Sequence, residues 1–567
     1  MKRWNVLAAS LIAATFVSLC LLPLTRDALR FDMSLAAGGS VWGKNLTNLG
    51  VKQSDLPLGG FGPKISSPSP ESAVPPSREL PVRLASTTQL SGRVKWAALQ
   101  ALAQEVPESP AVHATLLRMG CKNGGSVGVG HQALQDELRP PRYANYTNTP
   151  NPDEAGDAAI MLRSCAAGEK LDPDNAYFPA MAAIAYYSLN QDSQAQAALH
   201  RAAQKPLWRE YIDVEARGAI RRAELSYGPQ NSLTQSATLA MILFPHYASL
   251  RAMTRVTTAQ AMHAEQVGNF KKGLALRRDV ALLGDKMRDQ SSSLIGEVVG
   301  MSLVQVSEGR PGGAPAQEMK SEGNADRRWL SAQFMAYLQA HNEPNEAARW
   351  QAYLKAGEAT RSLVSRASDT SVFGSTTLFQ TQWRLLASLA LLGATTLLCV
   401  LGGLALLRPW LGQKTGRAAS VVGVGIFVAV MVWLLWQGIG NLRDSMAYSS
   451  VIQSLAGNGA DEAAEVQLLS RAFALEATIA LSALVAPFVL LGVSAILAHR
   501  HKISLTLLLR RYTLPLAVAL ALIYAAHLTS FSLRERSIQA ELQRVIQHEG
   551  RYIAEKLGKS WPSSPTF

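Results

Sequence analysis

The chain has 567 residues and a formal net charge of +13 at pH 7, and apolar residues make up 48% of it. It contains no run of five or more Lys/Arg and no motif that interleaves aromatic with basic residues, and much of its positive charge lies beside apolar segments. The composition therefore argues against a nucleic-acid-binding protein and favours a membrane protein with two or more domains.

The first predicted element is an apolar segment at residues 6–24, which follows Lys2 and Arg3. A transmembrane helix needs about 20 apolar residues to cross about 30 Å of hydrocarbon, and this segment is long enough. A basic start and an apolar middle also fit a cleaved signal peptide, but no convincing small-x-small cleavage site follows. We therefore expect residues 1–24 to remain as a signal anchor, with cleavage as the alternative.

Residues 25–85 are expected to form a linker rich in Pro, Ser and Gly. Seven prolines fall in this part of the chain, at positions 57, 63, 68, 70, 75, 76 and 81. Because proline donates no backbone hydrogen bond, such a segment cannot sustain a helix or a strand ladder. We expect an extended linker that holds the following domain away from the membrane.

Residues 86–370 are expected to form an all-α soluble domain. Alanine, leucine and glutamine are common there, and apolar residues recur at three- and four-residue spacings, which is typical of helices. Two stretches each predict a pair of helices, with turns at residues 268–269 and 341–344. Clusters of glycine and proline mark the longer loops.

The clearest motif in this domain is "LDPDNAYFPAMAAIAYYSLNQDSQAQAALHRAAQKP", residues 171–206. It resembles one tetratricopeptide (TPR) repeat, a pair of packed helices. It departs from that family at Pro179, where a large apolar residue is usual, and at Leu199, where the family has an aromatic residue. The residues that carry the resemblance are Ala182, Ala183, Tyr186, Ala195, Leu199, Ala202 and Pro206.

A single hairpin of this kind cannot bury its own apolar face and needs stacked neighbours. The resemblance therefore implies a TPR-like helical solenoid that binds a protein or peptide partner on its concave face.

No arrangement of residues predicts catalysis, a metal site or a cofactor site. "GGSVGVG" lacks the Gly-Lys-Ser/Thr of a phosphate-binding loop, and "SSSLIG" is not a G-x-S-x-G nucleophile motif. Residues 291–293 more simply cap the following helix, with Glu297 in its early turns. We expect a protein that is not an enzyme and binds no cofactor.

Two of the four cysteines, Cys121 and Cys165, lie in the soluble region. In an oxidising compartment they can form a disulfide. The alternative is a pair of buried free thiols, and the sequence favours neither.

Residues 383–533 are expected to form a bundle of four transmembrane helices. Four apolar segments there are long enough to cross a bilayer, at residues 385–407, 418–439, 473–498 and 512–533.

The Lys/Arg bias of the short loops predicts how these spans are oriented. The loops after the segments at 385–407 and 473–498 contain Lys and Arg and no acid, whereas residues 441–470 contain one basic residue and four acids. This pattern places the N-terminus and both basic loops in the cytoplasm. Residues 86–370 and the tail at 534–567 are then outside, and we expect the membrane to be the inner membrane of a bacterium.

Three polar residues, Gln437, Glu476 and His527, fall toward the outer ends of their spans. Ionisable groups are costly in a bilayer and usually face protein or water. A pair of Glu476 and His527 can relay protons or bind a cation, but we favour a hydrogen-bonded pair that fastens two helices.

The tail after the last span is expected to continue as an amphipathic helix. Its mixed charges suggest a protein partner rather than an anionic lipid surface. The apolar stripe consists of Ile538, Leu542, Val545, Ile546, Ile553 and Leu557.

These features together predict an integral membrane scaffold that displays an extracytoplasmic helical domain for protein–protein interaction. The alternative is a membrane component of a transport or export system. In either case the membrane helices are candidates for assembly with other subunits.

Overall fold

The computed structural model of the chain describes residues 2–22, 77–121, 125–138, 153–227, 232–240, 242–313, 324–366 and 505–563, and scattered residues within 25–32, 384–402 and 482–502. These residues form helices, and their only β-pairing is an isolated bridge between Asn175 and Leu207. The prediction of an all-α fold is confirmed for this part of the chain.

The chain divides into two compact units, each described by itself. The span unit comprises Met1–Ser67, Pro229–Ala237 and Val372–Leu542, and it contains all the predicted transmembrane segments. The helical unit comprises Pro68–Gly228, Thr238–Ser371 and Gln543–Phe567. Two helices, α12 (Ser232–Ala240) and α22 (Leu505–Gln547), contribute residues to both.

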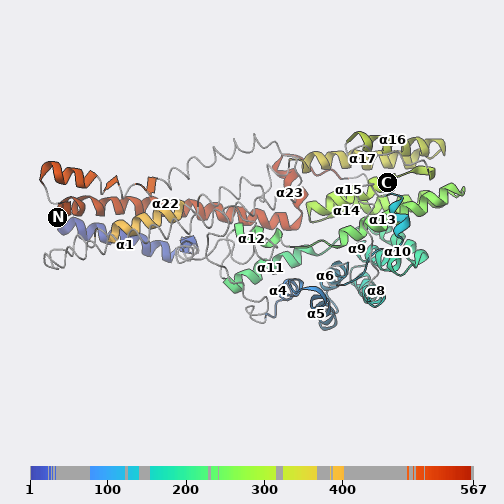
Figure 1. The fold of residues 1–567 in the computed structure, drawn as a ribbon, viewed down its shortest axis with the longest axis horizontal. Coiled ribbons are helices and arrows are strands. Elements are labelled where there is room, and N and C mark those ends of the chain that lie inside the picture. Colours follow the sequence, from blue (N-terminus) through green and yellow to red (C-terminus); the bar gives the residue numbers. More distant parts are fainter. Residues whose placement is uncertain are drawn as a thin grey trace. The chain divides into compact units, whose positions relative to one another are not determined.

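The other elements of the helical unit follow the chain and are shown in Figure 1. They are α4 (Leu80–Thr88), α5 (Gly92–Glu105), α6 (Pro110–Gly120), α7 (Gln132–Asp136), α8 (Glu154–Leu171), α9 (Tyr177–Ser188), α10 (Asp192–Gln204), α11 (Ile212–Tyr227), α13 (His246–Gln266), α14 (Phe270–Gln290), α15 (Leu294–Ser307), the 3-10 turn η3 (Pro311–Gly313), α16 (Asn324–Ala340), α17 (Pro344–Val364) and α23 (Glu549–Lys556).

The two predicted turns lie where the sequence placed them. Between α13 and α14, Gly268 has a φ of +83°, a conformation that glycine adopts without strain, and the Asn269 side chain accepts a hydrogen bond from the Lys272 amide to cap α14. The pair α16 and α17 is separated at residues 341–343, and Pro344 occupies the first turn of α17.

The linker ends earlier than expected, because α4 begins at Leu80 rather than after residue 85. Pro81 falls in the first turn of α4, where its missing N–H leaves no intrahelical bond unmade. The last proline of this stretch, Pro81, is therefore compatible with a helix.

The main core of the helical unit surrounds α9, in which every residue except Tyr186 and Ser188 is buried. Helices α8, α10 and α13 pack against it. The approach of α8 depends on Gly168, since a Cβ atom at that position would lie 2.1 Å from the Phe178 ring. A second cluster forms where the α16–α17 hairpin places Phe334 and Trp350 against apolar residues of α14 and α15.

In the span unit, α1 (Lys2–Leu21) packs against α22 and a helical stretch at Ala387–Val400. Within the described residues, Tyr512–Gln547 is a helix long and apolar enough to cross a membrane. Leu7–Leu21 and Ala387–Val400 are apolar but shorter. The predicted span at 418–439 and the first part of that at 473–498 lie outside the described residues.

The tail does continue as a helix beyond the last predicted span, and α22 ends only at Gln547. A single extended residue, His548, then separates α22 from α23. The predicted apolar stripe is covered by the chain itself. Ile538, Leu542, Val545, Ile546 and Ile553 are buried, while Leu557 is half-buried.

Candidate functional site

The residues that carry the TPR resemblance meet at the contact between α9 and α10. Ala183 on α9 is 0% exposed, as are Ala195, Leu199 and Ala202 on α10, and Ala182 is also buried. Their short side chains let the two helices approach closely. The remaining two lie at the edge of this contact, where Tyr186 is half-buried against the core and Pro206 is exposed after the end of α10.

The face of α9 that would line the groove of an open repeat array is covered by α13. The Tyr187 hydroxyl lies 3.0 Å from Thr257 Oγ1 and donates a hydrogen bond of 2.9 Å to Gln260 Oε1. At the other end of α9, the Tyr177 ring packs edge-on against His246. This repeat therefore offers no open concave face to a peptide.

A buried polar cluster joins α13 to the segments that precede α11 and α15. Glu210 lies at its centre and accepts hydrogen bonds from the Tyr247 hydroxyl at 3.1 Å and the Ser291 hydroxyl at 3.0 Å, while His246 Nε2 is 2.8 Å from the same carboxylate. Burial lowers the pKa of His246 and raises the pKa of Tyr247 well above its ordinary value.

His246 is 0% exposed and Ser291 is 1% exposed, so no substrate reaches this cluster. Of the serines at 291–293, Ser293 caps α15 by accepting a hydrogen bond from the Gly296 amide at 3.1 Å, whereas Ser291 is bonded to Glu210. The cluster acts as a structural crosslink between helices.

Of the three polar residues predicted at the outer ends of the spans, His527 is described. Its Nε2 atom lies 3.1 Å from the backbone carbonyl oxygen of Arg384, and the side chain is half-buried. The other two, Gln437 and Glu476, lie outside the described residues. The structure thus joins His527 to the start of the predicted span at 385–407.

The span unit also contains a buried acid that sequence reasoning did not single out. Asp32 is 1% exposed and accepts a hydrogen bond of 2.9 Å from the Tyr524 hydroxyl, and Ser388 lies beside the same carboxyl group. The Phe16 ring also packs on Tyr524. The available signal was an aspartate just beyond the first apolar segment together with a tyrosine inside the last one.

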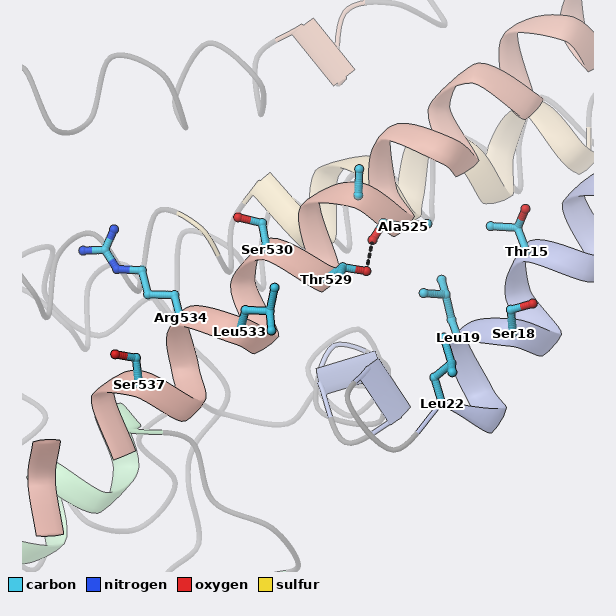
Figure 2. A pocket seen from close by; sticks show the side chains of 11 residues that line it. Thr15, Ser18, Leu19, Leu22, Ala525, Thr529, Ser530, Leu533, Arg534 and Ser537 are labelled. Atoms are coloured by element: carbon cyan, nitrogen blue, oxygen red, sulfur yellow. Dashed lines mark hydrogen bonds between the residues drawn. The ribbon is translucent and has the colours of Figure 1, made fainter. Parts of the chain in front are cut away.

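An open groove of about 860 Å³ runs between α1 and α22 in the span unit (Figure 2). The hydroxyls of Thr15 and Thr529 in its walls donate to carbonyl oxygens of their own helices, those of Leu11 and Ala525. Because these hydroxyls are already bonded, the groove presents mainly apolar side chains such as Leu19. Such a lining suits another helix or lipid acyl chains better than a polar ligand.

Both cysteines of the soluble region, Cys121 and Cys165, are buried in the core that surrounds α9. Burial raises the pKa of Cys165 well above its ordinary value, and the nearby Cys121 adds to this effect. A buried thiol of this kind is unreactive toward metals and oxidants, because the thiolate is the reactive form. The pairing of Cys121 with Cys165 stays a prediction.

The described residues contain no group of His, Cys, Asp and Glu side chains arranged to hold a metal ion. In comparisons with known proteins, no family model matches the chain, and neither the curated proteins nor the solved structures include a match.

Proposed function

We propose that the chain is an integral membrane scaffold that displays an extracytoplasmic all-helical domain for binding to other proteins. The observation that carries this proposal is the path of α22. The helix contains the last predicted span and continues unbroken to Gln547, and its end belongs to the helical unit. There, Ile546 packs with Ala216 and Ile220 of α11.

The position of the tail supports the proposed topology. Residues after 542 and most of residues 86–370 belong to one compact unit, so both lie on the same side of any membrane that the chain crosses. The last span must then end on the side where the helical domain lies. The charge bias of the loops, which places both outside, meets this requirement.

Two features of the span unit, one hydrogen bond and the relative direction of two helices, support the same topology. The bond between His527 and the Arg384 carbonyl joins the end of the last span to the start of the span at 385–407, as expected for two helices that cross in opposite directions. Residue numbers rise in the same direction along α1 and α22 in Figure 2, as expected for two helices that both cross from inside to outside.

The packing of α1 supports its retention as a signal anchor rather than its removal. Leu19 is 3% exposed in the core of the span unit, and Phe16 contacts Tyr524. Cleavage after residue 24 would remove these side chains and uncover apolar surface of α22. The scaffold role needs no catalytic step and no cofactor.

Because α13 covers α9, we place the protein partner on the outer helices of the helical unit. A photo-crosslinking amino acid at Val94 or Val267, which are 62% and 82% exposed, tests this in intact membranes. We expect a discrete adduct with another protein from at least one position. A probe at the fully buried Leu199 is the matched control and should give none. Failure of both exposed probes to capture any protein would contradict the scaffold role.

A membrane component of a transport system is the second candidate function, and Asp32 favours it. Ionisable side chains held among membrane helices often mark proton or ion pathways. This function predicts that reconstituted vesicles show flux driven by a pH gradient and that Asp32→Asn abolishes the flux, while Ser18→Ala in the groove wall leaves it intact. Absence of flux with the wild-type chain would remove this candidate and leave the scaffold.

A further inference from the structure

The segment at residues 548–562, called the tail segment below, is docked on the helical unit. Its helix α23 packs against α15 and α17, and Tyr552, Ile553 and Ala554 are all less than 4% exposed. An apolar contact of this kind needs no special chemistry. The polar contacts that surround it are unusual, because they bring acidic side chains together in a buried place.

The start of α23 is bonded to the start of α15 by three hydrogen bonds. The Glu549 amide donates to the Ser292 carbonyl oxygen at 3.0 Å, and Glu549 Oε2 accepts from the Leu294 amide at 2.9 Å. The Gly550 amide donates to Glu297 Oε1 at 3.2 Å. Gly550 is required for this approach, since a Cβ atom there would lie 2.2 Å from Glu297 Oε1.

His548 is the single non-helical residue between α22 and α23, and its ring is held at both nitrogens. Nε2 lies 3.0 Å from the Asp289 carbonyl oxygen, which can only accept a hydrogen bond, so Nε2 carries a proton. Nδ1 accepts from the Arg551 amide at 3.2 Å and lies 3.4 Å from Glu297 Oε1. A proton can therefore be exchanged between the His548 ring and the Glu297 carboxyl group.

The charged groups around this contact are mostly acidic. Glu297 is 0% exposed, and its Oε2 atom has no hydrogen-bond partner among the described residues. The side chains of Glu549, Asp289 and Arg288 face it from α23 and α14. Arg288 is shared, because it also pairs with Asp285 and donates to the Pro562 carbonyl oxygen at 2.6 Å.

We propose that the tail segment is a proton-dependent latch, which docks on α15 while Glu297, Glu549 and His548 share a proton and detaches when that proton is lost. In the detached state the chain has rotated at His548, and α23 has left the acidic groups at the start of α15. This latch goes beyond the scaffold role and does not depend on which side of a membrane the unit occupies.

The direction of the pH dependence follows from the proton count of the two states. Burial and the charge of Glu549 raise the pKa of Glu297 well above 4.5, burial raises the pKa of Glu549, and burial lowers the pKa of His548 below 6.5. In the detached state, in which water reaches both sides of the contact, the pKa values of these groups return toward their ordinary values.

Above pH 6.5 the three groups in the detached state have largely lost their titratable protons, whereas the docked state keeps at least one until the pH passes the raised pKa of Glu297. Docking therefore takes up a proton in this range and weakens as the pH rises, by about tenfold per pH unit at most for one proton. The lowered pKa of His548 acts in the opposite direction only at acidic pH, where the detached histidine is charged.

Thiol accessibility in the full-length, detergent-solubilised protein tests the latch. Ala554→Cys places a thiol in the buried face of α23, and Ser560→Cys places one at an exposed position of the same segment. The alkylation rates of the two thiols are measured by mass spectrometry. Their ratio reports the protection of the buried position, because the intrinsic pH dependence of thiol alkylation is common to both and cancels. The native Cys121 and Cys165, both buried, report in the same spectra that the helical unit stays folded.

We expect the protection of the thiol introduced by Ala554→Cys to fall several-fold as the pH is raised from 6.5 through the raised pKa of Glu297. Glu297→Gln keeps an acceptor for the Gly550 amide and removes the charge, so in this variant the protection should be higher at the alkaline end of this range and nearly independent of pH. Glu555→Gln, at an exposed acid of the same helix, is the matched control and should keep the wild-type slope.

A wild-type protection that does not change with pH would overturn the proposal, and so would equal slopes in Glu297→Gln and Glu555→Gln. If the Ala554→Cys substitution itself prevents docking, hydrogen exchange of the Tyr552 and Ile553 amides in the unmodified chain gives the same comparison, since both lie in α23.

Discussion

Replacement of Arg277 by methionine is expected to destabilise the helical unit by about 3–5 kcal/mol, because it leaves a buried carboxylate without its partner. The Arg277 guanidinium is 0% exposed and binds Glu265 through two bonds of 2.7 and 3.0 Å. It also donates to the carbonyl oxygens of Ser307 and Gly309, at 2.7 and 2.8 Å. One side chain thus connects α13, α14 and the end of α15.

The urea concentration at which protease begins to cleave the helical unit of the full-length protein measures this loss. Arg278→Met, at the next position along the chain, is the matched control. The Arg278 side chain is 37% exposed, and its Nη1 atom lies 3.6 Å from Glu346 Oε1. An exposed pair of this kind contributes about 0–1 kcal/mol. Similar stabilities for the two variants would mean that the buried pair does not hold these helices together.

Ala183→Leu is expected to cost about 1–3 kcal/mol through overpacking, and Ala202→Phe should behave in the same way. Both alanines are 0% exposed at the contact of α9 with α10, so added carbon atoms must push the helices apart. Ala197→Leu on the exposed side of α10 is the control and should change stability by no more than about 0.5 kcal/mol. Unchanged unfolding of both core variants would show that this contact tolerates larger side chains.

The helices of the helical unit could be predicted from the sequence because their signals are local. The small residues of the α9–α10 hairpin, the turn at Gly268 and the proline at the start of α17 each act within a few residues. The TPR resemblance describes this hairpin and no more. The packing of α13 on the face of α9 that would line a groove depends on tertiary contacts, which a degenerate repeat motif does not encode.

The polar contacts of both units could not be predicted from the sequence, because they join positions that are far apart along the chain. Asp32 and Tyr524 are separated by 492 residues, and Glu297 and Gly550 by 253. No periodicity or motif connects such pairs. The apolar stripe of the tail was visible as a pattern, but the pattern could not distinguish a surface of the same chain, where Ile546 and Ile553 are now buried, from a separate partner.

Site-specific labelling in intact cells tests whether the chain crosses a membrane with its helical unit and its tail outside. A membrane-impermeant reagent should label single tags inserted in residues 66–82 and after Lys559, and it should label a tag at Gln413 only after the membrane is permeabilised. Labelling at Gln413 in intact cells, or protection of the tag after Lys559, would contradict this topology.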